Sequence, residues 1–371
     1  MRNFDYVRAN SAGQAVNRHA AAQQPSYLAG GTTLLDLVKL DVMQPDQLVD
    51  INRLPLRQIE TLPDGLLRIG ALVTNTELAR HSIVRTDYPV LSQALLAGAS
   101  TQLRNKATTG GNVMQRVRCN YFRDGVSPCN KREPGSGCSA IGGHNRSVHA
   151  VLGTSAQCIA SHPSDMCVAM TAIGARITVQ GPNGLREIDF GEFHLLPGDT
   201  PWKEHALQPH ELITHVTLDA PLEGSRSGYL KLRDRASYQF ALTSSAVIVV
   251  MNGPRIREAR IAMGGVGTKP WRAREAEALL VGQSASMDVF AHAASVAFRD
   301  GRALYGESHP RPVAISRAAV SFLRPMMFER SISRSESPWR IRTRTCRYWY
   351  ISNFLFKPPS EANACRQSSG W

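Results

Sequence analysis

The order of apolar and polar positions predicts a chain of mixed α and β structure over its first 320 residues. In the first half of this region, short apolar runs that suit strands alternate with stretches of helical spacing. Strands are predicted at 26–29, 48–51 and 67–73. Helices are predicted at 32–40 with Thr33 as the N-cap, from Thr74, at 89–99 and from Pro163.

After residue 175 the pattern favours strands. Alternating positions at 176–180 and 186–190, joined by Pro182-Asn183-Gly184, predict a β-hairpin. A linker at 220–225 is the predicted domain boundary. The remaining predicted elements are strands at 212–218, 229–235, 243–251 and 259–263, then helices at 271–281 and 287–299.

The composition is that of an ordinary globular protein, with 43% hydrophobic and 20% charged residues in a chain of 371. No apolar run is long enough to cross a bilayer, and the first residues lack the apolar core of a signal peptide. We therefore expect no membrane insertion and no export signal in this chain.

The net charge of +13 would suit a nucleic-acid partner, but much of it lies at the C-terminal end. Residues 321–371 hold nine Lys or Arg against three Glu, with neither helical nor alternating periodicity. We interpret this segment as an aberrant, flexible tail and leave it out of the fold. A basic tail that binds RNA is the alternative.

Four cysteines lie in one glycine- and proline-rich stretch: Cys119, Cys129, Cys138 and Cys158. An irregular loop lets thiolates converge on a metal. The spacing is too open for a zinc ribbon and differs from a ferredoxin run, yet four thiolates can hold a [4Fe–4S] cluster. The total of seven cysteines argues against a pure disulfide framework. Three neighbouring histidines are alternative ligands: His144, His149 and His162.

Two glycine turns suggest an anion site. The turn at 29–33 lies where a predicted strand ends and a helix begins, which leaves free backbone N–H groups. The turn at 108–112 can supply a second cradle. Neither is a G-x-G-x-x-G fingerprint or a Walker loop, so a Rossmann or P-loop fold is not indicated. Each turn alone is more often a tight turn, but together, beside a cysteine loop, they favour a dinucleotide.

Three motifs in order carry a family resemblance. LAGGTTLLDL at 28–37, QLRNKATTGGN at 102–112 and HPSDM at 162–166 resemble the FAD-binding subunit of the xanthine dehydrogenase family of molybdenum hydroxylases. The resemblance covers about residues 1–320. The cysteine segments RCNYF at 118–122 and PCNKR at 128–132 are similar to the medium subunit of the bacterial heterotrimeric, periplasmic aldehyde oxidoreductase.

The resemblance implies an α+β fold. An FAD-binding domain of the vanillyl-alcohol-oxidase (PCMH) type, in two α/β parts, would occupy 1–219, with an iron–sulfur loop at about 115–160. A smaller C-terminal α+β domain of the molybdenum hydroxylase flavoprotein type would occupy 220–320. The tail at 321–371 matches nothing in the family, and a frame change near Ser321 would explain it.

The resemblance also implies site residues. Both glycine turns would hold the FAD diphosphate, Asp165 would accept from the ribitol or ribose side, Lys231 would lie near the isoalloxazine, and Ile213 would touch the ring system. Cys158, rather than Cys167, would complete the cluster ligands with Cys119, Cys129 and Cys138. The full cofactor-binding set is Leu28, Ala29, Gly30, Gly31, Thr32, Thr33, Leu34, Leu35, Thr108, Thr109, Gly110, Gly111, Asn112, Asp165, Ile213 and Lys231.

The implied function is electron transfer. A large partner subunit would oxidise an aldehyde at a molybdenum cofactor, and a small [2Fe–2S] subunit would pass the electrons to the FAD held here. The heterotrimer would reach the periplasm by export of a partner, or remain cytoplasmic. Two alternatives are a self-sufficient flavin oxidoreductase, for which no base over the flavin stands out, and a nucleic-acid-binding protein with a metal module.

Overall fold

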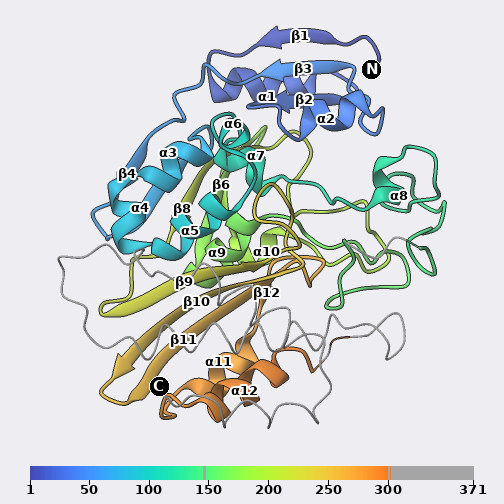
Figure 1. Cartoon of the computed structure of the whole chain (residues 1–371). Helices are drawn as coiled ribbons and strands as arrows, with labels where there is room; N and C mark the ends of the chain where they lie inside the picture. Colours follow the sequence, from blue (N-terminus) through green and yellow to red (C-terminus); the bar gives the residue numbers. More distant parts are fainter. Residues whose placement is uncertain (145–147, 300, 302–371) are drawn as a thin grey trace. The chain divides into compact units, whose positions relative to one another are not determined.

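The computed structural model describes residues 1–144, 148–299 and 301. Within this part the chain forms three β-sheets with helices packed against them, as labelled in Figure 1. The predicted tail at 321–371 lies outside the described residues. None of the described helices is both long and apolar enough to span a membrane.

The first sheet is parallel, in the order β1-β3-β2. Helix α1 packs on it and begins at Ser11, whose hydroxyl accepts a hydrogen bond from the backbone N–H of Gln14. Thr33 occupies the predicted N-cap position of α2, but its side chain makes no capping hydrogen bond. The elements are β1 (Asp5–Arg8), α1 (Ala12–Ala20), β2 (Pro25–Leu28), α2 (Leu34–Lys39) and β3 (Gln47–Asp50).

The second sheet is antiparallel, in the order β4-β5-β8-β6-β7. The predicted hairpin at 176–190 is confirmed as β6 and β7, which close at the Gly181–Gly184 pair. The predicted helix start at Thr74 is confirmed by a capping box with Glu77. The strands are β4 (Ile59–Thr61), β5 (Leu67–Gly70), β6 (Ala175–Gly181), β7 (Gly184–Asp189) and β8 (Leu212–Leu218).

Short helices connect these strands and bring the second glycine turn beside the sheet. Helix α9 is almost completely buried, because its residues pack against both the second and the third sheet regions. Ser164 caps it by accepting from the backbone N–H of Cys167 at 3.1 Å. The helices are α3 (Asn75–Arg80), α4 (Ser82–Asp87), α5 (Pro89–Ala97), α6 (Thr101–Arg104), α7 (Thr109–Val113), α8 (Asn120–Arg123), α9 (Asp165–Ile173) and α10 (Phe190–Phe193).

The third sheet is antiparallel, in the order β12-β11-β10-β9, and has helices on both faces (Figure 1). In β10, Ala246 and Ile248 belong to the core shared with α5 and α9, whereas Val247 and Val249 belong to the core under α11 and α12. The strand predicted at 229–235 is β9, which begins earlier, at Ser225, and ends earlier, at Leu232. The elements are β9 (Ser225–Leu232), β10 (Thr243–Asn252), β11 (Arg255–Gly264), β12 (Trp271–Arg272), α11 (Arg274–Leu280) and α12 (Met287–Val296).

The cysteine loop, which we define as residues 115–160, is largely irregular in its described part. Its regular features are α8 and three isolated bridges: Cys129 to Cys138, His149 to Ala160, and Leu152 to Gly267 outside the loop. It has its own buried cluster, which includes Leu37 of α2 together with Val117 and Phe122. The loop is therefore a packed unit that shares its core with the helix that follows the first glycine turn.

Candidate functional site

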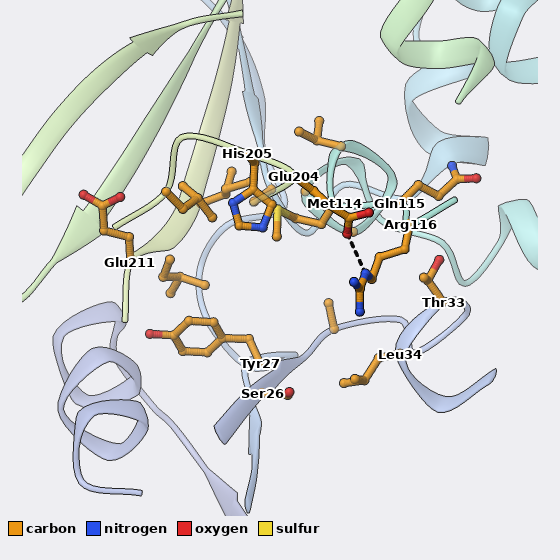
Figure 2. Close-up of a pocket in the computed structure, with 18 of the residues that line it drawn as sticks. Ser26, Tyr27, Thr33, Leu34, Met114, Gln115, Arg116, Glu204, His205 and Glu211 are labelled. Atoms are coloured by element: carbon orange, nitrogen blue, oxygen red, sulfur yellow. Dashed lines mark hydrogen bonds and ion pairs between the residues drawn. The ribbon is translucent and has the colours of Figure 1, made fainter. Parts of the chain in front are cut away.

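Both glycine turns border one cavity of about 960 Å³. Residues 29–34 line one side, and Thr108, Gly110 and Gly111 line another. This volume is at the upper end of the range for ligand pockets, which suits an extended ligand. Figure 2 shows the side chains that surround it, with Ser26, Tyr27 and Leu34 on one wall.

The first turn offers unpaired donors. In the described part of the chain, the backbone N–H groups of residues 30–34 donate no hydrogen bond to protein. Gly31 has φ +75°, a left-handed conformation that other residues rarely adopt. A Cβ on Gly30 would lie 1.9 Å from the carbonyl oxygen of Lys106, so only glycine allows the two segments to approach. A run of free amides in a glycine turn is suited to a diphosphate.

The second turn has a different role, because its amides are already used. The Gly110 N–H donates to the Ala71 carbonyl at 2.8 Å, and the Gly111 N–H donates to the Thr108 hydroxyl at 3.2 Å. The Thr109 hydroxyl donates to the Val73 carbonyl, which anchors the turn to the second sheet region. Asn112 accepts from Ser164 at 2.8 Å and does not line the cavity. The turn therefore shapes the wall with small residues.

Of the other predicted cofactor residues, Ile213 lines the cavity, whereas Asp165 and Lys231 do not. Asp165 accepts from Lys231 at 2.8 Å and from the Tyr229 phenol at 2.6 Å. Burial and the Asp165 carboxylate raise the pKa of Tyr229 well above its ordinary value, so the phenol keeps its proton. Asp165 instead borders a small neighbouring pocket that His162 and Phe240 share. Leu28 and Leu35 flank the first turn without lining the cavity.

The sequence alone did not identify the charged residues in the cavity wall, among which Arg116 and Lys131 both contact Glu204. Figure 2 shows Arg116 pointing into the cavity and bonded to Glu204. Arg116 follows closely on the second turn, but nothing in its local sequence distinguishes it from a surface arginine. Lys131 and Glu204 are far apart in the chain, so only the fold reveals their contact.

The four cysteines of the loop come together. Cys119, Cys129 and Cys158 are buried in one cluster, and Cys138 packs against it. Burial raises the pKa of Cys119 to about 11, so this thiol stays protonated unless a metal replaces the proton. The Sγ of Cys119 lies 3.6 Å from Nε2 of His149. Cys167 belongs to a different core, on α9.

The four thiols are not gathered tightly enough to form a single-ion site. Among the described residues, the one group of three or more metal-ligating side chains with ligand atoms within 4.8 Å of one another is His162, Cys167 and His194. Zinc binds thiolate sulfur at about 2.3 Å, so the ligand atoms of one zinc ion must lie this close to one another.

The His162, Cys167 and His194 side chains are buried together, with their ligand atoms within 4.8 Å of one another. Burial raises the pKa of Cys167 to about 12, which keeps its thiol protonated. His162 Nδ1 accepts from the Ser164 N–H at 3.4 Å, and burial lowers the pKa of His162 well below its ordinary value. Burial lowers the pKa of His194 to about 4. His162 and His194 line the cavity as buried, neutral side chains, whereas Cys167 lies behind them and does not line it.

Comparison with known proteins identifies the class. Residues 2–221 match the FAD binding domain in molybdopterin dehydrogenase, and residues 228–307 match the CO dehydrogenase flavoprotein C-terminal domain. The aldehyde oxidoreductase FAD-binding subunit PaoB of Escherichia coli (strain K12) is 52% identical over 281 residues, which is 76% of this chain and 86% of that protein. The glyceraldehyde dehydrogenase medium chain of Sulfolobus acidocaldarius is 28% identical over 293 residues, covering 79% and 86%.

A solved structure shows the same fold. The chain of carbon monoxide dehydrogenase from Hydrogenophaga pseudoflava superposes with a TM-score of 0.67 at 24% identity, covering 88% of this chain and 96% of that one. This chain belongs to the family of FAD-binding medium subunits of the molybdenum hydroxylases, of the aldehyde oxidoreductase and CO dehydrogenase type. It is an oxidoreductase subunit with an FAD-binding domain, which confirms the predicted family, fold class and general function.

Proposed function

We propose that this chain is the FAD-binding electron-transfer subunit of a molybdenum-containing aldehyde oxidoreductase. The 52% identity to an aldehyde oxidoreductase subunit supports the aldehyde class. A large molybdenum-cofactor subunit and a small [2Fe–2S] subunit would complete a heterotrimer. FAD accepts electrons singly and releases them in ones or twos, which suits a link between iron–sulfur clusters and an external acceptor.

The observation that carries this proposal is the single cavity bordered by both glycine turns. We assign the FAD diphosphate to the free amides of residues 30–34, and the small residues of 108–111 to the space beside it. The buried, neutral His162 and His194 would exclude water from one end without adding charge. Asp165, which borders the neighbouring pocket, would accept from the ribitol or ribose side, and its partner Lys231 would lie near the isoalloxazine, as the family resemblance implies.

We further propose that Cys119, Cys129, Cys138 and Cys158 hold a [4Fe–4S] cluster. The burial of Cys119, Cys129 and Cys158 in one cluster and the packing of Cys138 against it support this assignment. Buried thiols with raised pKa values gain by binding a metal, because the thiolate is then paired with positive charge. We place the domain boundary at 219/220 and the assembled enzyme in the periplasm, exported with a partner subunit.

A visible absorption spectrum of the purified full chain tests this proposal. We expect two flavin bands and a broad iron–sulfur shoulder, with about four iron atoms per chain. A colourless protein would contradict the flavin assignment, and a flavin spectrum without iron would contradict the cluster alone. Co-purification from cells that express untagged neighbouring subunits tests the heterotrimer, and fractionation of the same cells tests the compartment.

A further inference from the structure

Lys131 belongs to the cysteine loop by sequence but lies in the wall of the cavity. It follows Cys129 by two positions, yet its side chain is only 9% exposed and lines the cavity. Its ammonium donates to the Pro201 carbonyl at 2.8 Å and pairs with Oε1 of Glu204 at 2.9 Å. The loop thus contributes a buried cation to the space beside the glycine turns.

Glu204 joins this cation to a second one. Its other carboxylate oxygen, Oε2, accepts from Nε of Arg116 at 2.5 Å. Burial would raise the pKa of Glu204, but Arg116 and Lys131 outweigh it and hold that pKa below its ordinary range. One carboxylate between two cations leaves a net positive charge at the cavity wall, on the side where Figure 2 shows Thr33 and Leu34.

Arg116 has donors to spare. Glu204 engages its Nε, and in the described part of the chain its two terminal nitrogens make no hydrogen bond. The guanidinium lies 4.6 Å from the ring centre of Phe122, a buried member of the cysteine-loop cluster. An arginine fixed through Nε and by an aromatic ring can present both terminal nitrogens to a phosphate.

The same loop holds the helix after the first glycine turn. Asp36 of α2 pairs with Arg118 at 3.2 Å and with Arg123 at 2.8 Å, on either side of Cys119. Leu37 is fully buried in the cluster that contains three of the four cysteines. The cysteine loop therefore contacts the cofactor cavity at two places, through Glu204 and through α2.

We propose that Lys131 positions Glu204, and through it Arg116, as a diphosphate-binding group, so that an ordered cysteine loop raises the affinity of the cavity for FAD. Arg116 contacts the diphosphate, whereas Lys131 and Glu204 are positioning residues. By linkage, a bound nucleotide stabilises the loop by the same factor. This inference rests on the proposed assignment of FAD to the cavity.

Binding of ADP and of adenosine to the full chain, stripped of flavin, tests the inference by calorimetry. Wild-type protein should prefer ADP, because only ADP carries the diphosphate. Arg116→Gln should remove most of that preference. Lys131→Met and Glu204→Gln should each weaken ADP binding about tenfold while changing adenosine binding little, and the double variant should resemble the singles. Lys131→Arg keeps a positive charge at this position and should retain the preference for ADP. A general loss of stability in variants at residue 131 would not spare it.

Glu277→Gln is the matched control. Glu277 also forms a buried ion pair, with Arg272, but it lies on α11 and does not line the cavity, so this variant should bind ADP like wild type. ADP binding that is equally strong in wild type and Lys131→Met would overturn the inference, as would additive effects of the two substitutions. Wild-type protein that binds neither ADP nor FAD would instead contradict the proposed function.

Iron removal supplies a second readout. Chelation of the purified protein should weaken ADP binding more in wild type than in Glu204→Gln, where only the contact through α2 remains. An equal loss in both proteins would show that iron acts on the cavity by another route and would overturn the coupling through Glu204.

Discussion

The Lys231 ammonium lies 2.8 Å from Oδ2 of Asp165, and both side chains are almost completely buried, with 3% and 9% exposed. One residue is on β9 and the other begins α9, so the pair joins the third sheet to the helix that packs on it. Lys231 also donates to the Ala97 carbonyl at the end of α5. The pair therefore organises the region beside the cavity even without a cofactor.

Lys231→Met should destabilise the protein strongly. It leaves the Asp165 carboxylate buried without its cation, which typically costs about 3–5 kcal/mol in unfolding free energy. Urea unfolding, with the transition followed by circular dichroism, measures the change. The double variant Asp165→Asn/Lys231→Met should recover part of the loss, because no buried charge is left unpaired. A double variant less stable than Lys231→Met would contradict this account.

Substitution in the first glycine turn should abolish FAD binding. A Cβ at residue 30 would meet the Lys106 carbonyl at 1.9 Å, and Gly31 has a φ of +75° that valine cannot adopt without strain. We expect Gly30→Ala and Gly31→Val to purify without flavin absorbance. Gly253→Ala is the control, since Gly253 also has a positive φ but meets no atom within 4 Å. Full flavin content in Gly31→Val would show that the turn does not bind the diphosphate.

The cysteine substitutions separate the two thiol environments. Replacement of Cys119, Cys129, Cys138 or Cys158 by Ser should lower iron content by about four atoms per chain. Cys167→Ser should keep its iron, because Cys167 lies in the core on α9 and not in the loop cluster. Iron and labile sulfide analysis gives the readout. Iron lost from Cys167→Ser but retained in Cys158→Ser would reverse the assignment of the fourth ligand.

Asp50 should make stability depend on acid pH. Partial burial would raise its pKa, but hydrogen bonds from Tyr6, Asn52 and Arg8 outweigh this effect and lower the pKa to about 2. Since the folded state holds this carboxylate ionised below its ordinary pKa of 3.8, the stability it contributes is present above pH 4 and is lost as pH falls toward 2.

The test is the unfolding free energy of Asp50→Asn measured from pH 7 to pH 2. The variant should be less stable than wild type at pH 7, and the difference should shrink between pH 4 and pH 2. Asp199→Asn is the control, because Asp199 is exposed and its side chain makes no hydrogen bond in the described part of the chain. A difference that stays constant down to pH 2 would contradict the role of Asp50.

Local signals in the sequence predicted most elements well. The hairpin at 176–190 follows from turn residues and alternation, and β8 occupies the predicted range 212–218. Thr33 is the N-cap residue of α2 as predicted, but its φ of −108° and ψ of −48° place it in the helical region, and its hydroxyl makes no capping hydrogen bond. The continuous apolar run of β10 predicted a strand, but the sequence alone gave no reason why polar residues do not alternate within that run. The third sheet is covered on both faces, so no position in that run needs to be polar.

The sequence by itself determined the family, the glycine turns and the four cysteines, because motifs and turn chemistry depend on residues that are close in the chain. Only the tertiary structure decided which of these residues share a site. It placed both turns on one cavity, paired Asp165 with Lys231 beside it, and brought Lys131 to Glu204 and Arg116. Such contacts depend on how sheets and loops pack across long separations, and the charge of a side chain does not reveal which distant partner will neutralise it.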